Sequence, residues 1–442
     1  MHFPKDFIWG TATSSYQIEG ETPEAGRGEC IWGHFARTPG KVINGETGQV
    51  ACDHYYRYKD DVALIKSLGV SAYRFSVSWP RVIPQGIGAL NRTGLDFYSR
   101  LVDELLTSGI TPYLTLYHWD LPWALQEKGG WVNPDIAKWF ADYTAVMTDS
   151  LGDRVKHWIT INEPWCVSIL SHMLGIHAPG LKDPNMAFKA AHHTHMAHAA
   201  AMGVIRQTVP DAKAGITLNV TPAYPASDDP KDAQAAAYQD GFSNRWFLDP
   251  IFKGKYPADM VELYGEALNG IDLDEVSAAA APQDFIGINY YTRSVMKWND
   301  ESPLKGESVT QTGVPHTAMG WEVYPDALES FLLRLQREYS GDLPIFITEN
   351  GAAYEDPAPV NGVVEDPQRV EYYRLHLTAI SNAIAQGAPV KGYFAWSLMD
   401  NYEWAEGYAK RFGLVHVDFA TQQRTLKRSA IQLRDIATGV FA

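Results

Sequence analysis

The chain has 442 residues, of which 45% are hydrophobic, 12% aromatic and 20% charged, and its formal net charge is −15. This composition supports a large buried core and excludes a disordered chain, while the acidic balance excludes a nucleic-acid partner. No stretch reaches the roughly 18 apolar residues of a membrane span, and the first residues lack a secretory-signal pattern, so we expect a cytoplasmic protein without a membrane partner. Cys30, Cys52 and Cys166 lack disulfide-framework spacing, which predicts reduced thiols.

Short runs rich in β-branched and aromatic residues alternate with helical patterns along the chain. Eight runs have the length of a strand: 7–13, 72–79, 111–118, 157–162, 214–221, 285–292, 345–349 and 390–397. Apolar periodicity and end signals predict helices over 60–68, before Gly69, and around 95–105, before Gly109. Further helices are expected from Asn133-Pro134 onward and over 324–337 and 366–385.

Eight strand–helix alternations predict an α/β fold, a single (β/α)8 TIM barrel that forms one catalytic domain over residues 1–442. An open doubly wound sheet is the alternative, but that fold normally has a Gly-rich phosphate turn, which this chain lacks. Segments 14–57, 165–190 and 293–323 would be long loops on the C-terminal face of the strands, where barrels carry their sites.

Two of the expected strands end in a glutamate within a compact polar motif. Glu163 follows the fourth strand in Thr-Ile-Asn-Glu-Pro, and Glu349 ends the seventh in Thr-Glu-Asn-Gly. Closure of the barrel would bring both to one rim. Glycosidic bond cleavage requires such a pair, one carboxyl protonated and one ionised, and mutual repulsion raises one of the two pKa values.

These motifs resemble the paired signatures of glycoside hydrolase family 1, the retaining β-glycosidases typified by β-glucosidases. Further similar segments occur in the family's order across nearly the whole chain, among them FIWGTATSSYQIEG (7–20), YRFSVSWPRV (73–82), YHWDLP (117–122), INYYT (288–292), MGWEVYPDAL (319–328) and WSLMDNYEWAEGYAKRFGLVHVD (396–418). The resemblance implies that Glu163 is the general acid/base and Glu349 the nucleophile. Retention would place the two carboxyl groups roughly 5–5.5 Å apart.

The resemblance also implies a set of supporting and sugar-binding residues. Arg74 would keep the nucleophile ionised, Tyr291 would contact it, and Asn289 would be a supporting residue. Asn162 would bind the sugar 2-hydroxyl. Glycone recognition would come from Gln17, His118, Trp119, Glu403 and Trp404, with Trp396 as the stacking floor and Trp321 in the leaving-group subsite. Phe412 is also expected to bind the substrate. The remaining tryptophans 9, 79, 131, 139 and 158 are expected to be structural.

The predicted substrate is a terminal β-linked glucoside or cello-oligosaccharide, with some β-galactoside and β-fucoside activity. Relatives that act on 6-phosphorylated sugars carry a Tyr where Phe412 stands, and the carboxylate of Glu403 would repel a phosphate, so the 6-phospho-β-glycosidase alternative is disfavoured. A catalytically silent sugar-binding barrel and a metal-dependent barrel hydrolase are further alternatives. No cofactor is expected, and the oligomeric state stays open.

A cluster of histidines at positions 192, 193, 195 and 198 could suggest a metal site. The cluster lacks the HExxH pattern of a helical zinc site. Histidines spaced three residues apart, as at 192, 195 and 198, point in progressively different directions around a helix. We therefore expect a helix packed on the barrel and no metal.

Overall fold

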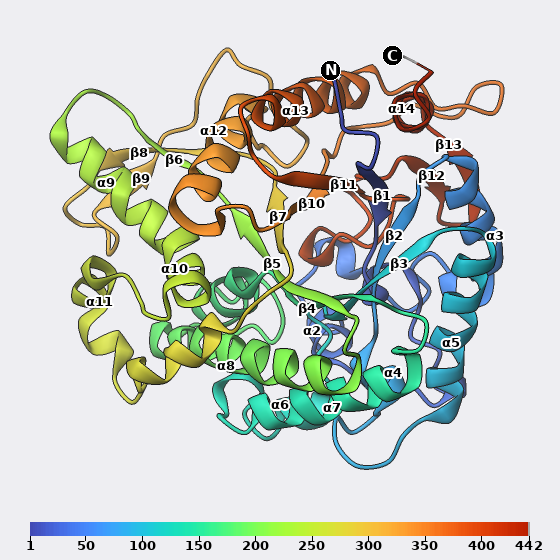
Figure 1. Cartoon of the computed structure of the whole chain (residues 1–442), viewed down its shortest axis with the longest axis horizontal. Coiled ribbons are helices and arrows are strands. Elements are labelled where there is room, and N and C mark those ends of the chain that lie inside the picture. The colour runs from blue at the N-terminus through green and yellow to red at the C-terminus, as the bar shows by residue number, and fades with distance from the viewer. Residues whose placement is uncertain (441–442) are drawn as a thin grey trace.

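The fold centres on a closed barrel of eight parallel strands, seen in a computed structural model that describes residues 1–440 (Figure 1). The strands are β1 (Ile8–Ala12), β2 (Ala72–Ser76), β3 (Thr111–Tyr117), β4 (His157–Asn162), β5 (Lys213–Val220), β7 (Ile286–Tyr290), β10 (Ile345–Asn350) and β11 (Val390–Trp396). Their order around the barrel is β1-β11-β10-β7-β5-β4-β3-β2, with β1 and β2 also paired. Each of the eight predicted runs overlaps one of these strands, with β5 starting one residue earlier and β10 ending one residue later than predicted, so the (β/α)8 prediction is confirmed.

Helices surround the barrel in Figure 1. They are α1 (Ser15–Ile18), α2 (Ile31–Ala36), α3 (His54–Ser67), α4 (Trp79–Val82), α5 (Arg92–Thr107), α6 (Trp123–Gln126), α7 (Ile136–Leu151), α8 (Pro184–Thr208), α9 (Pro230–Asp240), α10 (Trp246–Lys253), α11 (Ala258–Tyr264), α12 (Pro325–Leu335), α13 (Pro367–Ala385) and α14 (Arg428–Ala437). In the amphipathic α5, Leu101, Val102 and Leu105 are buried against the barrel. Burial of such apolar faces is the main stabilising contribution to the layer of helices.

The predicted helix ends agree with the structure more closely than the predicted starts. Gly69 and Gly109 follow α3 and α5 with φ of +65° and +78°, the left-handed conformation that glycine adopts without steric cost. In contrast, α3 already begins at His54 and α7 only at Ile136. The Asn133 side chain accepts the N–H of Asp135 at 2.9 Å, which makes a turn before α7 rather than its N-cap.

Two small sheets lie outside the barrel. β6 (Ala223–Pro225), β8 (Ser294–Trp298) and β9 (Gly306–Ser308) form one beside α9, and β12 (Val415–Asp418) pairs with β13 (Gln423–Leu426) in the other. The expected loop 165–190 begins with wide helical turns over Cys166–Met173. Of the tryptophans expected to be structural, those at 79, 131 and 158 are fully buried, Trp9 is nearly so, and Trp139 packs half-buried against the core.

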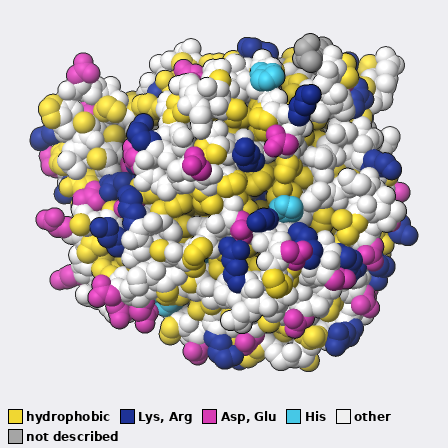
Figure 2. All heavy atoms as spheres, viewed as in Figure 1, with side chains coloured by type: hydrophobic (Ala, Val, Ile, Leu, Met, Phe, Trp, Pro, Cys, Tyr) yellow, Lys and Arg dark blue, Asp and Glu magenta, His cyan; other side chains and the backbone are white. Residues whose placement is uncertain are grey.

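The surface carries charges of both signs. On the face in Figure 2, acidic and basic side chains are interspersed, and hydrophobic side chains gather toward the middle. Within residues 1–440, no helix has the length and apolar character needed to span a bilayer.

Candidate active site

The two glutamates predicted at strand ends line one cavity. Glu349 belongs to β10, where it lies opposite Asn289 of β7, and Glu163 directly follows β4. The N–H of Glu163 donates to the carbonyl of Thr217 on β5 at 2.9 Å. Its φ of +51° is a strained conformation for a residue with a side chain, and such strain persists where surrounding contacts stabilise it, often at functional sites.

Glu349 is buried between one cation and one hydroxyl. Arg74, inside β2, donates to Oε1 at 2.7 Å, and the Tyr291 hydroxyl donates to Oε2 at 2.7 Å. Burial raises the pKa of Glu349, while Arg74 and Tyr291 act in the opposite direction. A carboxylate held by a guanidinium and a phenol is stabilised in its charged, nucleophilic form.

Glu163 is equally buried but is held by neutral donors. The Asn289 amide donates to Oε1 at 2.6 Å and the Cys166 thiol donates to Oε2 at 2.9 Å. Burial, followed by the charge of Glu349, raises the pKa of Glu163 to about 7. This carboxyl can therefore hold a proton near neutral pH, as a general acid must.

Asn162 connects the surroundings of the two carboxyls. Its Oδ1 accepts from Arg74 at 2.6 Å and from Asn289 at 3.1 Å, while Arg74 also binds Glu349 and Asn289 also binds Glu163. Because Oδ1 accepts twice, the Asn162 amide nitrogen is fixed as the donor toward Nε2 of His118, 3.1 Å away.

His118 lines the cavity as a neutral imidazole. Burial, with a smaller contribution from Arg74, holds the pKa of His118 well below its usual range, so the imidazole is neutral. Since Nε2 accepts from Asn162, Nδ1 carries the proton. Nδ1 is buried and has no hydrogen-bond partner among the described residues.

The cavity has a volume of about 760 Å³, a size typical of small-molecule sites. Eleven of the predicted site residues line it: His118, Trp119, Glu163, Asn289, Tyr291, Trp321, Glu349, Trp396, Glu403, Trp404 and Phe412. Arg74, Asn162 and Gln17 are fully buried beside these residues. Carboxyl groups and aromatic faces together suit a sugar, whose hydroxyls need polar partners and whose C–H faces stack on rings.

The predicted glycone residues form one packed group. The indole of Trp404 has ring-centroid distances of 4.7 Å to Trp119 and 4.6 Å to Trp32, and it stacks parallel to Tyr16. Burial, followed by the charge of Glu349, raises the pKa of Glu403 to about 8.

Gln17 holds the base of this group through its amide nitrogen. The amide donates to Asn401 at 3.0 Å, to the carbonyl of Tyr402 at 2.8 Å and to Glu403 at 3.4 Å. Gln17 therefore fixes the backbone next to Glu403 as well as its carboxyl.

Some cavity residues were not identified from the sequence. The cavity is also lined by Phe35 in α2 and by Lys41, His177, Lys182 and Met319, which belong to three segments far apart in the chain. These residues belong to the loop segments expected at this rim, 14–57, 165–190 and 293–323. The conformation of a loop decides which of its side chains face the cavity, and the sequence carries no periodic signal for that conformation.

The histidine cluster lies on α8, as expected for a helix packed on the barrel. His192 and His195 bond the Tyr256 hydroxyl, and His198 bonds Thr160 at 2.8 Å. Within residues 1–440, no group of three or more His, Cys, Asp or Glu side chains is arranged to hold a metal ion.

Comparisons with known proteins agree with this geometry. The family described as glycosyl hydrolase family 1 matches residues 1–439. Beta-glucosidase A of Thermotoga maritima is 49% identical over 428 residues, which cover 97% of this chain and 96% of that protein. The 1,4-beta-D-glucan glucohydrolase of Thermotoga neapolitana is 49% identical over 428 residues, again 97% of this chain and 96% of that protein.

The fold agrees equally closely with solved structures. The structure of the Thermotoga maritima beta-glucosidase in complex with deoxynojirimycin superposes with a TM-score of 0.96 at 48% identity, covering 99% of this chain and 98% of that one. Sequence and fold together show that this chain belongs to glycosyl hydrolase family 1.

Proposed function

We propose that this protein hydrolyses terminal, non-reducing β-D-glucosyl residues of β-glucosides and cello-oligosaccharides, with retention at the anomeric carbon. The observation that carries the proposal is the unequal environment of two buried carboxyls in one cavity. Glu349 is held by Arg74 and Tyr291, whereas Glu163 is held by Asn289 and Cys166. The names of these two curated relatives support a glucoside as the substrate.

In the first step the ionised Glu349 attacks the anomeric carbon. The glycosidic C–O bond breaks, an ester bond to Glu349 forms, and the proton of Glu163 goes to the leaving oxygen. In the second step Glu163 removes a proton from water, the water oxygen bonds to the anomeric carbon, and the ester bond breaks. Glu163 regains its proton, so the cycle closes without a metal or cofactor.

The sugar would be bound by the residues around these carboxyls. We assign Gln17, His118, Trp119, Glu403 and Trp404 to the glycone, with Trp396 as the stacking floor. Asn162 would assist at the 2-hydroxyl, with Arg74 and Asn289 keeping the carboxyls in place. The rings of Trp321 and Phe412, 6.1 Å apart at their centroids, would contact the leaving group.

A kinetic panel tests the proposal. Aryl β-D-glucoside, galactoside, fucoside and 6-phosphoglucoside are compared with cello-oligosaccharides, and NMR identifies the anomer released first. We expect hydrolysis of the glucoside, slower turnover of the galactoside and fucoside, and β-glucose as the first product. An α anomer would overturn retention, and preference for the phosphorylated sugar would favour the phosphoglycosidase alternative.

Two controls separate the remaining alternatives. A sugar-binding barrel without turnover would bind deoxynojirimycin but leave every glycoside intact. Loss of activity after treatment with a chelator would favour a metal-dependent hydrolase, whereas the proposed mechanism predicts unchanged rates.

A further inference from the structure

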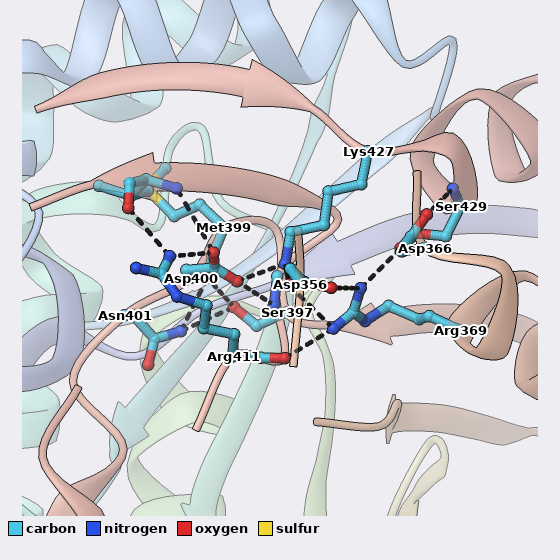
Figure 3. Close-up of polar contacts among 12 residues, drawn as sticks. Asp356, Asp366, Arg369, Ser397, Met399, Asp400, Asn401, Arg411, Lys427 and Ser429 are labelled. Atoms are coloured by element: carbon cyan, nitrogen blue, oxygen red, sulfur yellow. Dashed lines mark hydrogen bonds and ion pairs between the residues drawn. The ribbon is translucent and has the colours of Figure 1, made fainter. Parts of the chain in front are cut away.

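A largely buried ionic network includes Asp400 and Arg411, which flank the loop that carries Glu403 and Trp404 (Figure 3). Its three acids are Asp356, Asp366 and Asp400, and its three cations are Arg369, Arg411 and Lys427. These groups come from the segments after β10 and β11, from α13 and from the residue before α14. The charges balance, but burying so many ions is costly unless each is paired and hydrogen-bonded.

Asp400 connects this network to the loop. Its Oδ2 accepts from Arg411 at 2.6 Å, and its Oδ1 accepts from Lys427 at 2.6 Å and from the N–H of Gly413 at 3.0 Å. Burial alone would raise the pKa of Asp400, but Lys427 and Arg411 outweigh it and hold the pKa below its usual value. The carboxylate stands at the start of the loop, is therefore charged, and binds the returning end at Arg411 and Gly413.

The loop is closed tightly at this base. A Cβ added to Gly413 would lie 2.0 Å from the backbone nitrogen of Asp400, so the two ends approach closer than any side chain allows. The carbonyl of Arg411 also accepts from Arg369 at 2.8 Å, which ties the returning end to α13.

The residues next to this base face the cavity. Phe412 and Glu403 both line it, and Trp404 does so with a φ of +51°, a strained conformation that the surroundings must stabilise. The Lys410 amine donates to the carbonyl of Ala318 at 2.7 Å, next to the cavity residue Met319. Both sides of the loop base are thus connected to the cavity wall.

We propose that the ion pair of Asp400 and Arg411, charge-balanced by Lys427, positions Glu403 and Trp404 for binding of the sugar. Asp400 and Arg411 are positioning residues, because they act through the loop. The inference rests on the proposed function, since it concerns the same sugar site. Weakening the pair lets the loop base open, so that the hydroxyl-binding carboxyl and the indole face no longer hold the productive geometry.

The test compares Arg411→Gln with Arg334→Gln. The two arginines are similar: their side chains are 25% and 26% exposed, and each pairs with an aspartate at 2.6–2.7 Å. Arg411 pairs with Asp400, which is buried, and Arg334 pairs with Asp240, which is 13% exposed. Arg334 lies on α12 and pairs with the end of α9, away from the loop. The inhibition constant of deoxynojirimycin, KM and kcat for an aryl β-glucoside, and Tm are measured for both variants.

We expect Arg411→Gln to raise the inhibition constant and KM about tenfold, because a misplaced binding group costs one to two orders of magnitude. Arg334→Gln should lower Tm to a similar extent yet leave both constants within about twofold, since distant sites act independently. Arg411→Lys, which keeps the charge, should restore part of the affinity. The alkaline limb of the pH profile, set by Glu163, should stay in place in all three variants.

Equal inhibition constants in Arg411→Gln and Arg334→Gln would overturn the proposal, as would a loss of kcat alone. Hydrolysis by the unsubstituted protein tests the proposed function. The ratio of the inhibition constants of Arg411→Gln and Arg334→Gln tests whether the Asp400–Arg411 pair positions the loop. The two failures are therefore distinguishable.

Discussion

The thiol of Cys166 lies 2.9 Å from Oε2 of Glu163 and donates a hydrogen bond to it. No catalytic sequence pattern surrounds Cys166, and burial and Glu163 raise the pKa of its buried thiol well above the usual value. The thiol is therefore a neutral donor that favours the ionised form of Glu163, against the burial that favours the protonated form.

Replacing Cys166 should move the alkaline limb of the profile of kcat/KM against pH. Cys166→Val removes a donor to the carboxylate, so the pKa of Glu163 should rise above about 7. Activity is lost as pH rises through this pKa, so the limb should shift to higher pH, by about one unit for one lost hydrogen bond. Profiles of kcat/KM against pH on a glucoside with a poor leaving group measure the shift.

Cys166→Ser provides the control for this experiment because the hydroxyl remains a donor. Its limb should stay at or below that of the unsubstituted protein. A limb that moves to lower pH in Cys166→Val would contradict the role of the thiol.

Removal of the proposed nucleophile should abolish turnover. Glu349→Gly should lower kcat on an activated aryl glucoside on the order of a million-fold, because no ester can form. Azide can occupy the space left by the carboxylate and attack the anomeric carbon, which should restore part of the rate. NMR of the product should show an α-glycosyl azide, and a β-glycosyl azide would reverse the roles of Glu163 and Glu349.

Removal of the proposed acid should depend on the leaving group. Glu163→Ala should slow hydrolysis of a substrate with a poor leaving group by about 10²–10⁴-fold, the usual contribution of general acid catalysis. Glycosylation by an activated substrate needs little protonation and should be far less affected. A series of aryl glucosides of graded leaving-group pKa measures this, and equal losses across the series would count against Glu163 as the acid.

Tyr291, which contacts the proposed nucleophile, should influence the acidic limb of the profile of activity against pH. The Tyr291 hydroxyl lowers the pKa of Glu349, so Tyr291→Phe should raise that pKa. Activity falls as pH drops through the pKa of the nucleophile, so the acidic limb should move to higher pH, and kcat should fall about tenfold for one lost hydrogen bond to a charged group.

The neighbouring Tyr290 offers a matched control. Its hydroxyl donates to the carbonyl of Tyr324 at 2.5 Å. Tyr290→Phe should therefore cost stability without moving the acidic limb. Identical profiles for Tyr290→Phe and Tyr291→Phe would remove Tyr291 from its assigned role.

The barrel could be predicted because its signal is local. Buried parallel strands are short β-branched and aromatic runs, and glycines with positive φ end helices, so strands such as β4 and β10 and the ends of α3 and α5 follow from neighbouring residues. Helix starts were less accurate. At Asn133 the cap and proline signals fit a turn equally well, and tertiary packing decided that α7 begins at Ile136.

The sequence by itself determined the eight strands and the placing of Glu163 and Glu349 at strand ends, because barrel closure brings such ends to one rim whatever the loops do. Only the tertiary structure decided which carboxyl receives which partner. Arg74 binds Glu349, Asn289 and Cys166 bind Glu163, and Asp400 closes the loop that carries Glu403. These pairings join residues that are far apart in sequence. The distances between them depend on strand register and loop conformation, and no local sequence pattern encodes either.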